Sequence, residues 1–201
     1  MNAYPIVYTQ NPPVKRRRLT VFFRLFMLIP HAVVSFFYGI AAFFVLVFAW
    51  FAIVFTARYP AGMYNFVAGW LRFQSRMYAY ALLVVDEFPP FDGGEHPEYP
   101  VQIKIAAPAE SYSRLKAFFR FILAIPILIV QYAFEIWLFV VAVGIWFVAV
   151  IMGTTSPGLT EAMRFPFSYY VRSTGYMYLL TDQYPPFSET ETYVPVAPAA
   201  A

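Results

Sequence analysis

Two apolar blocks of 39 residues, which start 96 positions apart, constrain the fold of this chain more than any other feature. The first block covers residues 19–57 and contains one charged residue, Arg24. The second covers residues 115–153 and contains three, among them Arg120 and Glu135. A membrane-spanning helix needs about 20 apolar residues. Each block is therefore too long for one such helix and just long enough for two short ones.

The composition excludes most classes of soluble protein. Of the 201 residues, 61% are hydrophobic and 12% are charged, whereas a soluble domain averages about 45–50% apolar and about 25% charged residues. There is no cysteine, so a disulfide scaffold is excluded. The aromatic and β-branched content excludes disorder for most of the chain. The class that remains is an integral membrane protein.

The chain is a tandem repeat. When it is shifted by 96 positions, residues 19–91 align with residues 115–187 without gaps and with 22 identities in 73 positions. The most specific match is Asp-x-x-Pro-Pro-Phe, which occupies residues 86–91 and again residues 182–187. The same unit is therefore expected to fold twice.

A short β-prone segment precedes each repeat, at residues 4–8 and at residues 99–103. Both segments are predicted to form strands, and their pairing would tie the two repeats together. The predicted organisation is an N-terminal strand segment (1–14), a first membrane repeat (15–91), a polar linker with a short strand (92–112), a second membrane repeat (113–187) and a disordered tail (188–201).

The apolar blocks allow two main interpretations. In the first, each block is a helical hairpin: helices 19–37 and 40–57 turn at 38–39, and helices 115–133 and 136–153 turn at 134–135. In the second, a helix over 18–29 lies in the interface, Pro30 ends it, and one long span follows at 31–55 and again at 127–152. A single span per repeat would give the two repeats opposite orientations. A third arrangement, in which the later helices also cross, stays open.

The later helices, at 59–85 and 157–181, carry charges that disfavour a lipid-exposed span. Arg72 and Arg76 lie within five residues of one another, and a charge at the bilayer centre costs about 2.5–3.5 kcal/mol on insertion scales. We expect amphipathic helices that lie in the interface with their polar faces outward. The predicted fold is therefore an all-α membrane protein, in which each copy has a hydrophobic hairpin or one long kinked span, plus an interfacial helix.

Basic residues cluster at positions 15–18, directly before the first apolar block. This is the usual cytoplasmic flank of a membrane segment, and it also suits anionic lipid headgroups. The apolar sequence that follows disfavours a nucleic-acid-binding role. The expected location is the inner membrane of a bacterium, as a multi-pass protein whose N-terminus, linker and C-terminus are cytoplasmic.

The residue pattern resembles a family of bacterial membrane proteins, common in actinobacteria, that is called domain of unknown function 4389. The resemblance covers both repeats. It implies a membrane location and the repeat unit, and it implies no activity. The second copy departs from the pattern because Ile127 stands at the position of His31. The matching pieces are Phe-Phe-Arg at 22–24, Leu-Ile-Pro-His at 28–31, Trp-Phe-Ala-Ile-Val-Phe-Thr at 50–56, Arg-Tyr-Pro-x-Gly at 58–62, the arginines at 72 and 76, and Asp-x-x-Pro-Pro-Phe at 86–91.

Seven charged residues are candidate contacts with lipid or with a partner protein. Arg24 and Arg120, near the start of each apolar block, are expected either to anchor the helix by snorkelling to the interface or to bind lipid phosphate. An Arg–Asp pair in each repeat is expected to pin the later helix to the Pro-Pro-Phe turn. Glu135 is either a wet turn residue or an intramembrane carboxylate that couples protons or ions. The residues of the expected pairs are Arg76 with Asp86 and Arg172 with Asp182.

No motif in the sequence indicates catalysis, a cofactor or a metal. Only two histidines exist, His31 and His96, and no ligand cluster surrounds either. The leading hypothesis is a non-catalytic scaffold or accessory subunit of a larger cell-envelope complex, whose partners are the lipid bilayer, anionic lipids and a membrane protein complex. The alternatives are a small lipid or ion transporter built from the two repeats, and a membrane-shaping hairpin protein.

Overall fold

Each repeat contributes one strand, one short helix, one long apolar helix and one helix of 21 residues. The computed structural model describes residues 4–12 and 15–187. The predicted disordered tail lies outside these residues. The elements are β1 (Ile6–Gln10), α1 (Arg18–Met27), α2 (Ile29–Thr56) and α3 (Ala61–Ala81), followed by β2 (Val101–Ile105), α4 (Arg114–Phe118), α5 (Arg120–Met152) and α6 (Pro157–Met177).

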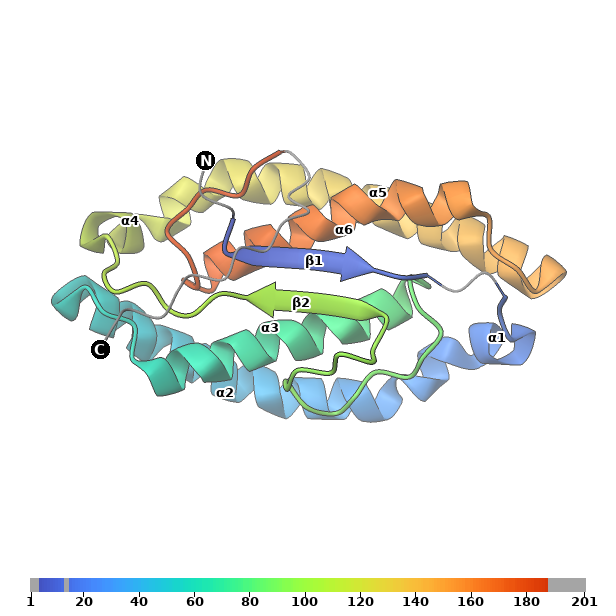
Figure 1. Cartoon of the computed structure of the whole chain (residues 1–201), viewed down its shortest axis with the longest axis horizontal. Helices are drawn as coiled ribbons and strands as arrows, with labels where there is room; N and C mark the ends of the chain where they lie inside the picture. Colours follow the sequence, from blue (N-terminus) through green and yellow to red (C-terminus); the bar gives the residue numbers. More distant parts are fainter. Residues whose placement is uncertain (1–3, 13–14, 188–201) are drawn as a thin grey trace.

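The elements form three layers whose long axes run in nearly the same direction (Figure 1). The ribbon of β1 and β2 is one outer layer. Helices α3 and α6 lie behind the ribbon, and the long helices α2 and α5 form the opposite outer layer. The middle layer is therefore covered on both sides.

A pseudo-two-fold axis relates the repeats and passes through the centre of the ribbon. The two strands are antiparallel, with Ile6 opposite Ile105 and Gln10 opposite Val101, which confirms their predicted pairing. Helix α1 packs beside α5, and α4 packs beside α2 (Figure 1). The ends of α2 and α5 therefore meet the beginning of the other repeat.

The hairpin interpretation of the apolar blocks is wrong. Helix α2 runs without a break from Ile29 to Thr56, and Gly39 lies inside it. Helix α5 runs from Arg120 to Met152, with Glu135 in its interior. Gly39 lies beside Trp70 of α3, and a Cβ at this position would lie at an ordinary contact distance of 3.5 Å from that ring. The membrane-shaping hypothesis depended on these hairpins and is not retained.

The structure is closer to the single-helix interpretation. In the first repeat the helix is interrupted at Leu28, and Pro30 sits in the first turn of α2, where its missing N–H costs nothing. In the second repeat the interruption comes earlier, at Phe119, and Pro126 lies inside α5. Equivalent prolines therefore have different places in the two long helices.

The expectation that α3 and α6 lie in the interface with their polar faces outward is also wrong. Eleven of the 21 residues of α3 and twelve of the 21 residues of α6 are buried. Arg76 and Arg172, which were expected on a polar outer face, are at most 1% exposed. These helices form the core because the ribbon covers one side of them and α2 and α5 cover the other.

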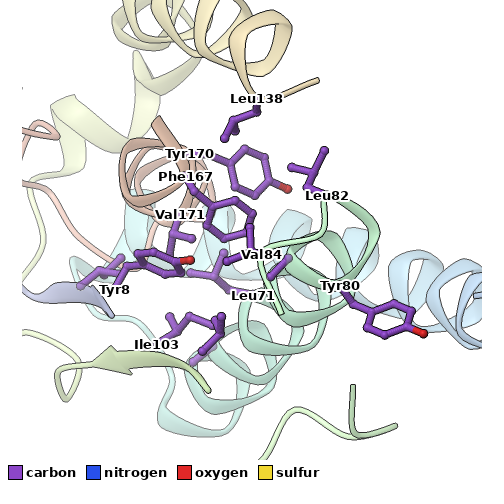
Figure 2. Close-up of a cluster of buried hydrophobic side chains, with 14 of the residues drawn as sticks. Tyr8, Leu71, Tyr80, Leu82, Val84, Ile103, Leu138, Phe167, Tyr170 and Val171 are labelled. Atoms are coloured by element: carbon purple, nitrogen blue, oxygen red, sulfur yellow. The ribbon is translucent and has the colours of Figure 1, made fainter. Parts of the chain in front are cut away.

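The main core lies between the ribbon and the middle layer. Figure 2 shows Tyr8 and Ile103 from the two strands facing Leu71 of α3 and Phe167 and Val171 of α6. Since both strands and both repeats supply this cluster, one copy of the repeat cannot complete it alone.

The two long helices end at equivalent residues in the left-handed conformation. Ala57 ends α2 with φ of 59°, and Gly153 ends α5 with φ of 71°. A left-handed conformation costs a residue with a Cβ about 1–2 kcal/mol, and glycine avoids this cost. Ala57 is therefore the less favourable of the two caps.

We expect substitutions at these two caps to change the free energy of unfolding in opposite directions. Ala57→Gly should raise the free energy of unfolding by about 0.5–1 kcal/mol, because relief of the left-handed strain exceeds the added chain entropy. Gly153→Ala should lower it by at least about 1 kcal/mol, since its new Cβ would also lie 3.2 Å from Nε of Arg18. Equilibrium unfolding of the two variants in detergent measures both values. Equal signs would contradict this account of the caps.

Candidate functional site

Each repeat contains a buried arginine that pairs with the aspartate of the Asp-x-x-Pro-Pro-Phe motif. Nη2 of Arg24 contacts Oδ1 of Asp86. Nη2 of Arg120 lies 2.8 Å from Oδ1 of Asp182. Both arginines are 2% exposed, whereas the aspartate side chains are 18% and 20% exposed. The pair joins the start of each apolar helix region to the end of the following core helix.

A tyrosine completes each cluster. The guanidinium of Arg24 lies 4.2 Å from the centre of the Tyr80 ring, and that of Arg120 lies 3.9 Å from the ring of Tyr176. The interaction of a desolvated arginine with an aromatic ring of this kind contributes about 2 kcal/mol. We call these groups the Arg–Tyr–Asp clusters; their members are Arg24, Tyr80 and Asp86 in the first repeat and Arg120, Tyr176 and Asp182 in the second.

The ends of α3 and α6 supply backbone acceptors to the same arginines. Leu83 and Leu179 occupy equivalent positions and are left-handed, with φ of 63° and 62°. Each turns the chain sharply after its helix. The turn is closed by a backbone hydrogen bond, from Val84 N–H to the Ala79 carbonyl in the first repeat and from Leu180 N–H to the Gly175 carbonyl in the second. Nη1 of Arg24 then donates to the carbonyls of Tyr80 and Val85, at 2.6 and 2.7 Å. The cluster therefore fixes a strained turn.

Arg16 adds a second cation to the first cluster, which sequence reasoning missed. Its Nη1 lies 2.6 Å from Oδ1 of Asp86, and its Nη2 donates to the carbonyl of Leu83 at 2.6 Å. Arg16 is 6% exposed, although the other basic residues of 15–18 are exposed. Burial lowers the pKa of Arg16, and the charge of Asp86 opposes that shift. The basic run therefore mixes one structural arginine with residues that face solvent.

Two expectations about the arginines need correction. Arg24 and Arg120 do not snorkel, because their guanidinium groups are enclosed by protein and paired with aspartate. Asp86 pairs with Arg24 and Arg16, so it does not pair with Arg76, which donates from Nη1 to the carbonyl of Gly94 at 2.8 Å. Burial lowers the pKa of Arg76. Arg76 thus holds the linker on α3 instead of the Pro-Pro-Phe turn.

Arg172, the repeat equivalent of Arg76, is fully buried in α6. Its Nε donates to the carbonyl of Ser168, one turn earlier, at 3.2 Å. Its guanidinium lies 5.9 Å from the centre of the Phe165 ring. Asp182, its expected partner, instead bonds Arg120 and accepts from the amide of Ser113 at 2.6 Å. In both repeats, the aspartate thus bonds residues at the beginning of the apolar helix region.

The Pro-Pro-Phe segments fold back onto helices of their own repeats, the first onto the beginning of α2 and the second onto α6. The ring of Phe91 stacks on His31 with a centroid distance of 3.9 Å, and Nε2 of His31 lies 2.8 Å from the carbonyl of Pro89. In the second repeat Phe187 stacks on Tyr169 at 5.3 Å. His31 therefore has a structural contact, and the phenylalanines of the two segments stack on different helices of the repeat.

The linker carries a surface histidine between two carboxylates. Nε2 of His96 lies 2.8 Å from Asp92, and Nδ1 lies 3.1 Å from Glu98. The hydrogen bond to Asp92, then that to Glu98, raises the pKa of His96, and the hydrogen bond from His96 lowers the pKa of Asp92. At pH values between the pKa of Asp92 and the pKa of His96, the carboxylate is therefore negative while the imidazole is positive.

This arrangement predicts a pH-dependent linker. The contribution of His96 is fully present below its ordinary pKa of about 6.5 and is lost as pH rises through its raised value. We expect the amide of Gly94, which donates to Asp92 at 2.7 Å, to exchange faster at high pH after correction for intrinsic exchange. Hydrogen exchange across pH 5–9 measures this effect. A His96→Gln variant serves as the control, and an equal pH response in that variant would contradict the prediction.

A chain of polar side chains crosses the axis between the repeats. Gln74 and Tyr170 are repeat equivalents, and Nε2 of Gln74 lies 2.8 Å from the Tyr170 hydroxyl. The hydroxyl of Tyr178 donates to Oε1 of Gln74 at 2.7 Å and accepts from Nε1 of Trp70 at 3.1 Å. The two core helices are therefore joined by hydrogen bonds as well as by packing.

Glu135 lies in the middle of α5, half-buried, instead of in a turn. It accepts from Nε2 of Gln131 at 2.9 Å, and Oε1 of Gln131 accepts from the hydroxyl of Ser173 at 2.7 Å. Burial and, secondarily, the charge of Glu135 raise the pKa of Tyr78 to about 12. Glu135 thus faces the core helices. Within residues 4–12 and 15–187, no group of three potential metal ligands occurs.

The outer surfaces of α1, α2, α4 and α5 are apolar. Of the 39 large hydrophobic side chains that are exposed among the described residues, 34 lie in 19–55 or 115–152. The segments Arg18–Thr56 and Arg120–Met152 are both long and apolar enough to cross a membrane, and only 17% and 28% of their most apolar windows are buried. The core helix of a soluble protein would be mostly buried, so the low burial of these two helices favours an apolar environment for their surface.

Comparison with known protein families identifies both repeats as copies of one domain. The family model described as "Domain of unknown function (DUF4389)" matches residues 18–92 and again residues 114–189. The chain belongs to the DUF4389 family. Both copies of the DUF4389 domain contain a complete Arg–Tyr–Asp cluster, made of identical residues at equivalent positions. No curated protein and no solved structure matches the chain.

Proposed function

We propose that this DUF4389 protein is a non-catalytic scaffold or accessory subunit that lies along the cytoplasmic leaflet of a bacterial plasma membrane. Helices α1, α2, α4 and α5 enter the leaflet side-on, while the ribbon faces the cytoplasm. The segregation of exposed apolar side chains onto these four helices carries this proposal. Helices that lie in the interface bury their apolar faces to a depth of about 5–10 Å.

The ribbon disfavours an orientation in which α2 and α5 cross the bilayer. The ribbon runs alongside these helices (Figure 1), so a crossing along their axes would carry the strands through the hydrocarbon as well. A two-stranded ribbon has open edges, whose backbone groups find no partners in lipid. Lys104, an exposed residue of β2, would lie at membrane depth at a cost of about 2.5–3.5 kcal/mol. The in-plane orientation avoids both costs.

The pseudo-two-fold symmetry also favours the in-plane orientation. The axis passes through the ribbon along the viewing direction of Figure 1, across the three layers. With this axis normal to the membrane, both repeats present the same surface to the same leaflet. Exposed basic residues at both ends of the long helices then face the same headgroup layer, and their excess suits the cytoplasmic side. These residues are Lys15, Arg17, Arg18, Arg58, Arg114 and Lys116.

A scaffold role follows from the surfaces that remain in water. Within the described residues, the outer edges of β1 and β2 carry no further strand, and such edges suit strand addition by a partner protein. The charged side chains of the clusters are already engaged with one another, as expected of structural groups.

Gentle extraction from native membranes, followed by mass spectrometry of the proteins that stay bound, tests the scaffold role. We expect a stoichiometric membrane-protein partner. Thr9→Arg with Lys104→Glu, on the exposed face of the ribbon, should release it, whereas Val140→Trp on the apolar surface should not. Recovery of the chain only as a free monomer would contradict the proposal.

A second candidate function is a small lipid or ion transporter. The polar chain through Gln74 and Tyr170, together with Glu135 nearby on α5, favours it because polar groups at an inter-repeat interface suit a pathway. In proteoliposomes, transport that is lost in Glu135→Gln but kept in Glu95→Gln would support this candidate. Equal fluxes in empty vesicles and in proteoliposomes would exclude it.

A further inference from the structure

Among the apolar cavities on the lipid-facing side of the molecule, two form a pair, one on each side of the pseudo-two-fold axis. The first has a volume of about 420 Å³ and lies between the second half of α2 and the start of α5. The other has a volume of about 510 Å³ and lies between the second half of α5 and α1. Ligand pockets typically have volumes of about 300–1,000 Å³, so both have the size of a binding site.

The cavities are repeat equivalents. Each of the ten residues that line the first cavity has its equivalent, 96 positions away, in the lining of the second. Six of these ten pairs are identical, against 22 identities in 73 positions for the whole repeat. The lining has therefore diverged less between the repeats than the rest of the chain. The identical pairs include Val47 with Val143, Trp50 with Trp146, and Arg120 with Arg24.

One buried arginine lies at the polar end of each apolar lining. Arg120 lines the first cavity and Arg24 lines the second. In both residues Nε is buried and has no hydrogen-bond partner among the described residues, although the other guanidinium nitrogens are engaged. The unpaired Nε recurs at the same place in both repeats, but it is enclosed by protein, so the arginine marks the end of the lining and does not itself offer a donor to the cavity.

Exposed basic residues lie just beyond each cavity. Arg17 and Arg18 precede the part of α1 that lines the second cavity, and Nε of Arg18 lies close to Gly153 at the end of α5. Arg114 and Lys116 lie on or beside α4, which packs against α2 near the first cavity. Trp50, in the lining, donates to the carbonyl of Ala117 at 2.9 Å and so ties α4 to the cavity. Each apolar slot thus has a cationic rim.

We infer that the cavities are two equivalent binding sites for an anionic phospholipid of the bilayer. Each site takes an acyl chain into the apolar slot and the phosphate onto the exposed arginines and lysine at its rim. An apolar slot alone would accept any lipid; the basic rim selects an anionic headgroup. This inference rests on the proposed membrane location, and it adds a ligand class and a stoichiometry of two per chain.

Native mass spectrometry of the purified full-length chain with added dioleoyl phosphatidylglycerol tests the two sites. We expect two retained lipids per chain in the wild type. Val47→Trp and Val143→Trp each fill one cavity and should each leave one lipid, and the double variant should retain none. Val140→Trp, on α5 but outside the cavity lining, is the matched control and should retain two.

The headgroup preference needs a separate comparison. Dioleoyl phosphatidylcholine should require at least a tenfold higher concentration for equal retention. Arg17→Gln with Arg18→Gln, both exposed, should remove this preference at one site and leave the other unchanged. This surface variant keeps the test informative if a tryptophan variant fails to fold.

Flotation with phosphatidylglycerol vesicles separates this inference from the proposed function. If the chain floats but retains no lipid, or retains phosphatidylglycerol and phosphatidylcholine equally, the inference of two anionic-lipid sites is wrong. The proposed membrane location is unaffected by either result. Equal loss of lipid in Val140→Trp and Val143→Trp would overturn the two sites too. A chain that does not float contradicts the membrane location itself.

Discussion

Replacing Asp86 with alanine is expected to lower the free energy of unfolding by about 3–5 kcal/mol, the usual effect of removing one partner from a buried ion pair. Asp86 contacts two arginines, Arg16 and Arg24, which are 6% and 2% exposed. Without the carboxylate both cations stay buried and unpaired. Equilibrium unfolding in bicelles, with circular dichroism as the readout, measures the loss.

Two further variants calibrate this prediction. Asp182→Ala should cost less than Asp86→Ala, because Asp182 pairs with a single arginine, Arg120. Glu95→Ala should change stability by at most about 1 kcal/mol, since Glu95 pairs with Arg72 through a side chain that is 74% exposed. If Asp86→Ala were no more destabilising than Glu95→Ala, the Arg–Tyr–Asp cluster would not hold the fold together.

Replacing Tyr80 with alanine is expected to cost about 3–5 kcal/mol, as for other buried aromatic residues. The Tyr80 side chain is fully buried, packs on Phe88 and carries the guanidinium of Arg24 on its ring. Its removal would leave a cavity and also take away the surface on which Arg24 stacks. The same unfolding measurement applies.

Tyr80→Phe separates the ring from the hydroxyl. The hydroxyl makes one weak contact, with the sulfur of Met27 at 3.6 Å, so this variant should lose less than about 1 kcal/mol. A loss in Tyr80→Phe as large as that in Tyr80→Ala would show that the hydroxyl, and not the ring beneath Arg24, stabilises the cluster.

The repeat and its strands were predictable from the sequence because their signals are local. The offset of 96 positions finds both copies, and the β-prone segments found both strands, although the strands begin two residues later than expected. The internal course of the apolar blocks was not predictable in this way. Gly39 and Glu135 resemble turn residues when the sequence is read alone, whereas the structure places both inside continuous helices.

The residues of the candidate site were predictable from the sequence, but the predicted pairing between them was wrong. Arg24, Arg76 and Asp86 all repeat, so identity between the copies marks each of them. It does not say which arginine reaches the aspartate. That choice depends on the left-handed turn at Leu83, which places Asp86 beside α1 and leaves Arg76 beneath the linker. Leucine carries no sequence signal for such a turn.

The in-plane orientation is tested most directly by the sidedness of two engineered cysteines. The chain has no cysteine of its own. Lys15→Cys and Arg58→Cys place single exposed thiols just before α1 and just after α2. In sealed inside-out and right-side-out vesicles, a membrane-impermeant maleimide should label both from the cytoplasmic side only. Labelling of the two cysteines from opposite sides would show that the helix crosses the bilayer and would contradict the account.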